Sequence, residues 1–251
     1  MIRFAVRMVV QVSNPVIKPI SHVVDTKVLK SEVEYEYAQL LGKARKLKGS
    51  LMVIPSDPSN QRLISPSLLA LTCPVAMVMK VKVGLIGTRE TFKRIAEGTV
   101  YHRHYEQWFK NVNKDFDVYT EMALSSSDTV GVPDIVYCKD TCGLIELKTV
   151  WKVDDEHRDA YVRQMAMYYD LLRQSNMNIT EAWLVTMNTV ELVGVRELMG
   201  KVNEAREYLR MASGNYPDVP PNPRLCANCI LTPVCPSYRN LSNRLLGLGG
   251  G

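Results

Sequence analysis

The sequence lacks an unbroken apolar run of about 18 or more residues, which excludes a helix that spans a membrane. It also lacks a GxxxxGKS or GxxxxGKT loop, which excludes a nucleotide-driven motor of that class within this chain. Residues 1–15 are too short and too interrupted by charged and polar side chains to be a secretion signal. We therefore expect a cytoplasmic protein, in a reducing compartment where clustered cysteines indicate a metal site before they indicate disulfides.

The chain contains enough apolar residues for a sizeable core. Of its 251 residues, 46% are hydrophobic and 23% are charged, which excludes a chain that is disordered by composition. The formal net charge of +5 is compatible with a polyanionic partner but does not require one. No internal repeat is present.

The sequence of residues 1–62 predicts one strand and one helix. Residues 1–12 are rich in β-branched side chains and favour a strand. The predicted helix is 31–48, with Ser31 and Glu34 as a capping box and Gly49 as its stop. We find no residues with an evident chemical role in this part of the chain.

Strand-like and helical segments alternate in the rest of the chain, which predicts an α/β fold. Ser65 and Pro66 predict a helix start, and Pro74 should disturb that helix. The other predicted elements are helices at 89–110, 156–174 and 196–212, and strands at 117–124, 132–138, 143–150, 182–187 and 190–195.

One apolar run, GLIELKTV, contains the charged pair Glu146 and Lys148. Alternate residues of a strand share a face, so these two side chains should lie side by side while Ile145 and Leu147 face the other way. If this strand forms a hairpin with the preceding one, Asp134 converges with Glu146 at the open end. Two carboxylates can hold a divalent cation, and the lysine can orient water and stabilise charge on a phosphate. A solvated surface ion pair is the alternative.

The order of short motifs around this pair resembles the RecB-type branch of the PD-(D/E)xK nucleases. Pro133–Asp134 and Glu146–Leu147–Lys148 match the motif that names the group, EGTVYH resembles its GxxxH element, and QMAMY resembles its QxxxY element. The resemblance implies catalytic roles for Asp134, Glu146, Lys148, Gln164 and Tyr168. It also implies a Mg²⁺ or Mn²⁺ site formed by His102, Asp134, Glu146 and the carbonyl of Leu147.

Each outlying motif has an ordinary alternative when it is taken alone. His102 would be a surface or packed histidine, and Gln164 and Tyr168 would be residues of a helix surface. The order of the motifs along residues 98–168 favours the nuclease interpretation over these alternatives. We also expect aromatic side chains such as Tyr168 or Trp151 to stack on bases of a bound nucleic acid.

Cysteines form a second candidate site. Cys226, Cys229 and Cys235 have the spacing C-x2-C-x5-C, followed by a proline. The pattern resembles RecB-like nucleases in which one cysteine before the nuclease core and three after it hold an iron–sulfur cluster, which implies Cys73 as the fourth ligand and a 4Fe–4S cluster. Zinc is the alternative, because four thiolates suit it equally well.

The two remaining cysteines, Cys138 and Cys142, flank the predicted hairpin turn. We expect both to be plain thiols, with a hairpin disulfide as the alternative.

Taken together, the nuclease motifs and the split cysteine motif resemble the CRISPR-associated Cas-four exonuclease family over residues 63–240. The implied fold is a PD-(D/E)xK restriction-endonuclease-like core, a mixed central sheet flanked by helices, with a helical iron–sulfur-stapled region. Residues 1–62 would be an accessory strand and helix, and 241–251 a flexible tail.

In function, the resemblance implies a hydrolase that trims single-stranded DNA ends for spacer acquisition, with the Cas-one and Cas-two integrase proteins as partners. An iron–sulfur nuclease of repair or viral origin, a zinc-stapled endonuclease and a non-catalytic DNA-binding scaffold are the rival interpretations. The presence of Asp134, Glu146 and Lys148 argues against the scaffold.

Overall fold

A computed structural model of the chain describes residues 14–57, 64–213, 226 and 229–238. Its centre is a mixed five-stranded sheet in the order β10-β9-β8-β7-β4. The β8 and β9 strands are parallel, and the other neighbouring pairs are antiparallel. The bounds are β4 Asp117–Thr120, β7 Ile135–Cys138, β8 Cys142–Leu147, β9 Ile179–Val185 and β10 Val190–Val193.

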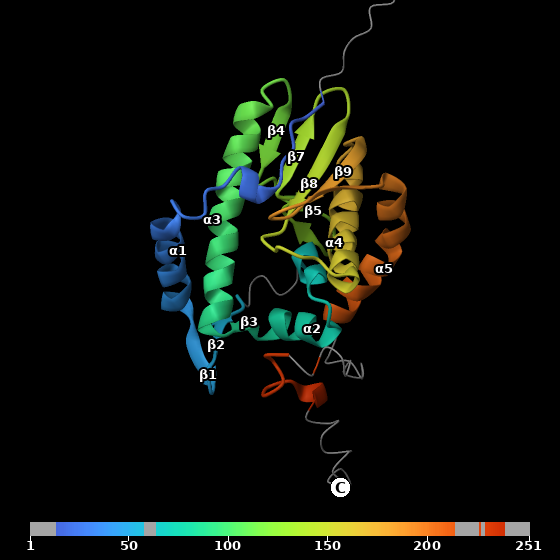
Figure 1. Cartoon of the computed structure of the whole chain (residues 1–251). Helices are drawn as coiled ribbons and strands as arrows, with labels where there is room; N and C mark the ends of the chain where they lie inside the picture. The colour runs from blue at the N-terminus through green and yellow to red at the C-terminus, as the bar shows by residue number, and fades with distance from the viewer. Residues whose placement is uncertain (1–13, 58–63, 214–225, 227–228, 239–251) are drawn as a thin grey trace, which may run out of the picture.

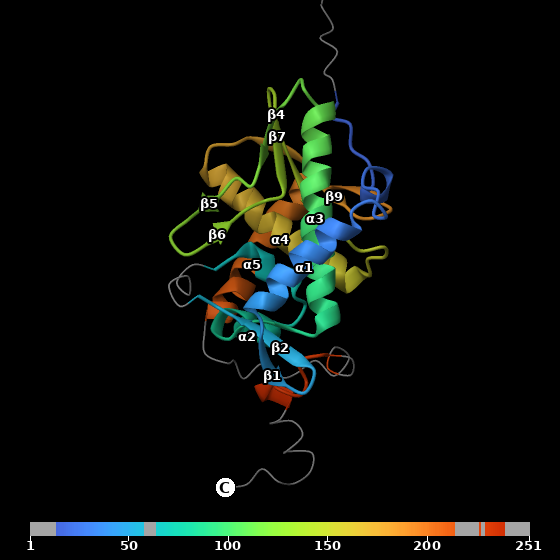
Figure 2. The ribbon, with the colours of Figure 1, turned by 90° about the vertical axis from the view of Figure 1, so that its left-hand side faces the viewer.

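Helices cover both faces of this sheet (Figures 1 and 2). The long helix α3 (Arg89–Val112) packs on one face through Ala96, Val100 and Phe109, with α1 (Lys30–Lys43) outside it. Helix α4 (Asp155–Gln174) packs on the other face, with α5 (Val195–Ser213) against it. The predicted α/β class, with a mixed central sheet flanked by helices, is confirmed.

The helices predicted in this core are also confirmed. Residues 89–110 form one continuous helix, which begins at a capping box made by Thr88 and Thr91. The predicted strand at 117–124 is shorter than expected, because β4 ends before Glu121, whose φ of 56° breaks an extended backbone. Short pieces complete the core: η1 Ile20–His22, β5 Leu124–Ser125 and β6 Val130–Gly131.

The predicted helix 31–48 is wrong at its C-terminal end. Helix α1 stops at Lys43, and the chain turns at Gly49, which has a φ of +57°. That turn lets β1 (Arg45–Lys48) pair with the more buried β2 (Leu51–Pro55). Backbone bonds to a neighbouring strand therefore override the helical preference of the lysine-rich sequence.

The capping box predicted at the other end of α1 is also absent. The residue that caps α1 is Leu29, and its side chain makes no capping hydrogen bond. Ser31 and Glu34 lie inside the helix, so neither occupies the position from which a capping box is formed.

A smaller unit lies below the central sheet in Figure 1. It contains the sheet β1-β2-β3, with β3 at Gly84–Gly87, and the helix α2 (Pro74–Lys82), whereas the preceding helix η3 (Pro66–Ala70) packs against α4. Ser65 caps η3 as predicted, but Pro74 begins α2 rather than disturbing a helix. Because β2 pairs with β3, segments on the two sides of the predicted boundary at residue 62 share one sheet.

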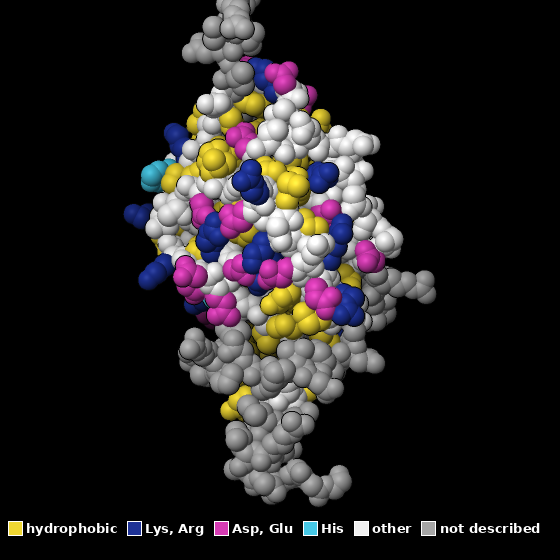
Figure 3. Space-filling model, turned by 90° about the vertical axis from the view of Figure 1, so that its right-hand side faces the viewer, with side chains coloured by type: hydrophobic (Ala, Val, Ile, Leu, Met, Phe, Trp, Pro, Cys, Tyr) yellow, Lys and Arg dark blue, Asp and Glu magenta, His cyan; other side chains and the backbone are white. Residues whose placement is uncertain are grey.

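Charges of both signs are interspersed over the face that carries α5 (Figure 3). Arg206 pairs with Asp170, and Arg210 pairs with Glu207. Both arginines are therefore neutralised by a neighbouring carboxylate.

Two sequence predictions fall on residues that the structure does not describe: the strand at 1–12 and the tail at 241–251. Among the described residues, no helix is both long enough and apolar enough to cross a membrane.

Candidate active site and cysteine site

The start of β7 and the end of β8 lie side by side at one end of the strand pair, because the two strands are antiparallel. Ile135 pairs with Ile145, which places Asp134, just before β7, beside Glu146 of β8. The predicted hairpin is therefore confirmed. Ile145 and Leu147 pack on the α3 side of the sheet, whereas Glu146 faces α4.

Lys148 is held by two partners directly after β8. Its Nζ donates to Glu146 Oε1 at 2.6 Å and to Gln164 Oε1 of α4 at 2.9 Å. The ammonium also lies 4.9 Å from the centre of the Tyr161 ring. The Lys148 side chain is 17% exposed and that of Glu146 is 2% exposed, so the pair is not a solvated surface ion pair.

Asp134 links this pair to helix α3. Its Oδ1 lies 3.2 Å from Nδ1 of His102, and its Oδ2 accepts a hydrogen bond of 2.7 Å from the backbone N–H of Leu147. One carboxylate thus touches two different groups through its two oxygens. Carboxylates and an imidazole within reach of each other are a ligand set that fits Mg²⁺ or Mn²⁺.

Burial and mutual charge set the protonation of these groups. Burial raises the pKa of Glu146 to about 7, against the opposing effect of Lys148. Burial acts to lower the pKa of Lys148, but the carboxylates of Glu146 and Asp134 outweigh it, so this pKa is raised. Burial also opposes ionisation of Asp134, yet His102 and Lys148 lower its pKa overall. At neutral pH Lys148 is therefore an ammonium, which can stabilise negative charge but cannot accept a proton.

Tyr168 is buried next to Gln164 and is not exposed in a cleft. The Nε2 of Gln164 donates to the Tyr168 hydroxyl at 3.1 Å, and the Tyr168 side chain is 2% exposed. The expectation that Tyr168 stacks on bases is therefore wrong, because its ring is enclosed by the core. Trp151 is 63% exposed, and its stacking role stays a prediction.

Sequence analysis missed two charged residues near this site. Glu106 is one turn after His102 on α3, and its carboxylate approaches both His102 and Asp134. Burial, together with Asp134, raises the pKa of Glu106 to about 7. Lys80 of α2 is the second residue; burial and the nearby ammonium of Lys148 lower its pKa. The four-residue spacing of His102 and Glu106 was visible in the sequence, but no sequence signal placed Lys80 there.

The four cysteines implied by the resemblance line one cavity of about 30 Å³ in the smaller unit. Cys73 caps α2, and Cys226, Cys229 and Cys235 approach from the end of the chain. The rest of the lining is mostly apolar, and it includes Val75, Met79 and Leu231.

Burial raises the pKa of Cys73 and of Cys226, and repulsion from neighbouring thiolates adds to both shifts. Four thiols around one apolar cavity fit a structural metal centre, because a bound metal stabilises the thiolates that burial and repulsion disfavour. The identity of that centre, 4Fe–4S or zinc, stays a prediction.

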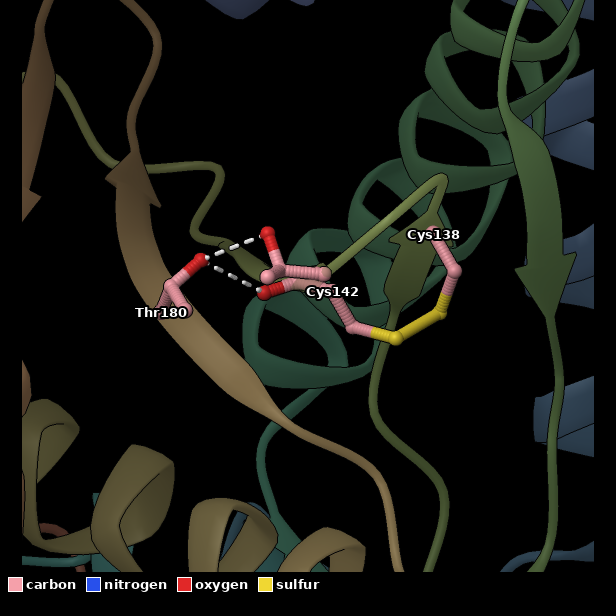
Figure 4. The surroundings of a disulfide bond; sticks show 4 residues. Cys138, Cys142 and Thr180 are labelled. Carbon is pink, nitrogen blue, oxygen red and sulfur yellow. Dashed lines mark hydrogen bonds between the residues drawn. A yellow bond between two sulfur atoms is a disulfide. The ribbon is translucent and has the colours of Figure 1, made fainter.

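The expectation of free thiols at Cys138 and Cys142 is wrong, because a disulfide joins them (Figure 4). The hairpin register makes the two residues a directly opposed pair, with Cα atoms 4.1 Å apart. The hydroxyl of Thr180 donates to the hydroxyl of Thr141 at 3.0 Å and to the carbonyl of Cys142 at 3.5 Å. The disulfide closes the end of the hairpin opposite to Asp134.

Comparison with known proteins shows a likeness of fold. No protein-family model matches the chain, and no curated protein sequence is similar to it. The structure described as "Crystal structure of SSO0001" is similar at a TM-score of 0.52 and 14% sequence identity, over 84% of this chain and 96% of that one. An alkaline exonuclease from Laribacter hongkongensis aligns at a TM-score of 0.34 and 15% identity, over 62% of this chain and 91% of that one.

Proposed function

We propose that the protein is a metal-dependent deoxyribonuclease of the PD-(D/E)xK type. The observation that carries this proposal is the placement of the Lys148 ammonium against Glu146 and Gln164, with Asp134 on the adjoining strand. A buried lysine paired with a carboxylate adds little net stability to a fold, so a role in phosphodiester hydrolysis accounts for this arrangement better than a structural role does.

Each side chain of the site has a role in the proposed reaction. A bound Mg²⁺ or Mn²⁺ would polarise the phosphodiester and acidify a water molecule. His102, Asp134, Glu146 and the carbonyl of Leu147 are the groups that would hold this cation. Lys148, which is protonated, stabilises the negative charge that develops on the phosphate.

Two further groups keep Lys148 in place. Gln164 fixes its direction from α4, and the buried hydroxyl of Tyr168 in turn holds the amide of Gln164. An ammonium that is fixed before the substrate arrives loses little side-chain entropy during the reaction.

The cysteine site completes the proposal. Cys73, Cys226, Cys229 and Cys235 would hold a 4Fe–4S cluster that joins the end of the chain to α2. The same helix carries Lys80, whose pKa is lowered by burial and by the positive charge of Lys148. The cluster would therefore hold a helix that contributes a positive charge beside the proposed nuclease site.

For the substrate, we propose single-stranded DNA entered from an end, in the preparation of new CRISPR spacers with the Cas-one and Cas-two integrase proteins. This part rests on the resemblance in sequence motifs over residues 98–168 and on the split cysteine motif. An enzyme that trims ends must accept many sequences, so contacts to the phosphate backbone should dominate and binding should weaken steeply with salt.

The test is digestion of labelled DNA by the full-length chain with Mg²⁺ or Mn²⁺, against a control with EDTA. The substrates are a linear single strand, a circular single strand of the same sequence and a blunt duplex. We expect digestion of the linear strand only. Equal cleavage of the circular strand would show an endonuclease, and absence of metal-dependent cleavage on all three would refute the proposal.

The partners are tested separately by pull-down of purified Cas-one and Cas-two proteins with the tagged chain. Retention of either protein supports a role in spacer acquisition. Failure to retain them, with cleavage intact, would favour a repair or viral role for the same nuclease.

A further inference from the structure

The hairpin of β1 and β2 carries a group of cations that the proposed reaction does not use. All four side chains of β1 are exposed, and three of them, Arg45, Lys46 and Lys48, are basic. Lys43, the last residue of α1, adds a fourth exposed cation just before the strand. We call these four residues the β1 cluster. The hairpin lies on the side of the molecule that carries α1 and α3 (Figure 2).

The cations of the β1 cluster lack partners that would neutralise them. Among the described residues, the side chains of Lys43, Arg45 and Lys46 form no salt bridge and no hydrogen bond. Lys48 donates to the carbonyl of Pro233 at 3.3 Å, which is a neutral acceptor and leaves the charge of the ammonium uncompensated. The two arginines on the α5 face, in contrast, are each paired with a carboxylate.

The acidic side chains that lie nearest in the sequence are engaged elsewhere. Three glutamates of α1 each contact a basic side chain of α3, in the pairs Glu32–His104, Glu34–Lys93 and Glu36–Arg103. Helix α1 therefore turns these carboxylates toward α3 and leaves the cations at its C-terminal end without counter-charges. A local excess of positive charge attracts a polyanion.

Charged residues on an edge strand also have a structural use, because they hinder pairing with a strand of another chain. This use applies to β1, which is an edge of the sheet β1-β2-β3. Charges of either sign hinder such pairing, however, whereas the β1 cluster is basic throughout. The uniform sign favours an anionic partner over edge protection alone.

The β1 cluster lies within reach of a DNA strand held at the proposed nuclease site. Strand β1 is two strands from β3, which is roughly 10 Å, and α3 begins directly after β3. His102 is further along α3, roughly 20 Å from the first residue of the helix. At a spacing of about 3.4 Å per phosphate, a strand on the order of ten nucleotides long would contact both places.

We propose that the β1 cluster binds the phosphate backbone of the single-stranded DNA, on the part of the strand that lies away from the scissile bond. The inference rests on the proposed nuclease function and names a surface that holds its substrate. Contacts from lysine and arginine to phosphates carry no sequence information, which suits an enzyme that accepts many different ends.

The experiment measures how salt changes the affinity of the full-length chain for a labelled single strand. Fluorescence anisotropy follows the binding without added Mg²⁺ or Mn²⁺, so that no strand is cut. The variant is Arg45→Gln/Lys46→Gln, and Lys48 is kept because it contacts the segment that carries the cysteines. We expect the slope of log Kd against log salt concentration to fall by about 1.4, at about 0.7 for each lost phosphate contact. At about 0.15 M salt, binding should be about tenfold weaker.

The matched control is Lys110→Gln/Lys114→Gln, which removes the same number of charges. Both lysines are exposed and lie at the C-terminal end of α3, roughly 30 Å along its axis from the end next to β3. We expect the slope and the affinity of this control to match those of the wild type. Equal losses in the two variants would show a response to net charge alone and would overturn the proposed surface.

The outcomes separate this inference from the proposed function. An unchanged slope in Arg45→Gln/Lys46→Gln would overturn the surface even if the protein digests DNA. Unchanged binding together with new dimers in sedimentation would assign the β1 cluster to edge protection instead. A reduced slope in a protein that cleaves no DNA would support the surface and refute the nuclease. Thermal unfolding of both variants confirms that a lost affinity does not reflect a lost fold.

Discussion

The carboxylate–lysine site and the cysteine site are built in opposite ways. In the first, His102, Asp134, Glu146, Lys148 and Gln164 already contact one another, and the strands and helices that carry them are buried in the main core. In the second, four thiols surround a cavity in the smaller unit, and their own repulsion opposes their ionisation.

The difference concerns what each site needs before it can form. Protein contacts alone place the side chains of the carboxylate–lysine site, so a metal ion would find its ligands already arranged. The cysteine site joins segments that lie 153 residues apart, from Cys73 to Cys226, around a small apolar cluster. We expect the first site to survive removal of its ion and the second to depend on its metal for stability.

The largest expected effect is on the cysteine site. Cys73→Ser removes one of four ligands and should release the metal centre, with loss of iron and of the broad visible absorbance of a cluster. Loss of the metal centre should lower the free energy of unfolding by roughly 3–4 kcal/mol. At about 3 °C per kcal/mol for a chain of this size, the melting temperature should fall by about 10 °C. Iron analysis and thermal unfolding measure both effects.

Two further results would change this part of the account. Full iron content in Cys73→Ser would show that another residue is the fourth ligand. Zinc in place of iron in the wild type, with no visible absorbance, would replace the cluster by a zinc centre of the same four residues.

The second effect concerns the charge pair of the carboxylate–lysine site. Lys148→Met leaves Glu146 buried beside no cation, so we expect a loss of about 3 kcal/mol in the free energy of unfolding, the lower end of the range for breaking a buried pair. The double variant Glu146→Gln/Lys148→Met should recover most of that loss, because no lone charge remains. Urea unfolding of both single variants and the double variant measures the coupling. Additive losses would mean that the two groups do not interact as the structure describes.

The third effect is smaller, and it should leave both sites intact. Replacing Cys138 and Cys142 together by Ser removes a disulfide that closes a short loop, which costs about 2 kcal/mol by the chain-entropy relation. Iron content and DNA cleavage should be unchanged, because the disulfide closes the far end of the hairpin from Asp134. Loss of iron in this variant would instead link Cys138 or Cys142 to the metal centre.

The smallest effect tests whether the hydrogen bond from Gln164 to Tyr168 helps to hold Lys148 in place. Tyr168→Phe removes the hydroxyl that accepts from Gln164, at a cost of about 1 kcal/mol in stability. Cleavage should slow a few-fold, because Gln164 then orients Lys148 less firmly. Tyr169→Phe, the neighbouring tyrosine on α4, is the matched control and should leave cleavage unchanged. Equal effects of the two substitutions would show that the Tyr168 hydroxyl does not support the site.

Local patterns explain why much of the main core was predictable from the sequence. The alternation around Glu146 and Lys148 predicted their common face, and the two apolar runs separated by a turn predicted the β7–β8 hairpin. The four-residue spacing of Gln164 and Tyr168 likewise predicted a shared helix face, which the bond between them confirms. Each of these predictions depends on residues that are near one another in the chain.

The sequence predictions that failed depend on strand pairing or on contacts between segments that are distant in the chain. The lysine-rich segment Arg45–Lys48 has helical preference, yet it pairs with β2. The disulfide follows from the exact pairing of Cys138 with Cys142, which composition does not fix. Glu106 is recognisable as a candidate ligand only once β7 brings Asp134 against α3.

The most direct test of the account is single-turnover cleavage of a labelled linear single strand by Lys148→Met. Lys152→Met is the matched control, because Lys152 is an exposed lysine four residues further along the chain. We predict that Lys148→Met binds Mn²⁺ and DNA but cleaves at least about a hundredfold more slowly than the wild type, the loss expected for one charge-stabilising group. Lys152→Met should cleave at the wild-type rate. Cleavage by folded Lys148→Met at a rate close to that of the wild type would contradict the assignment of the active site.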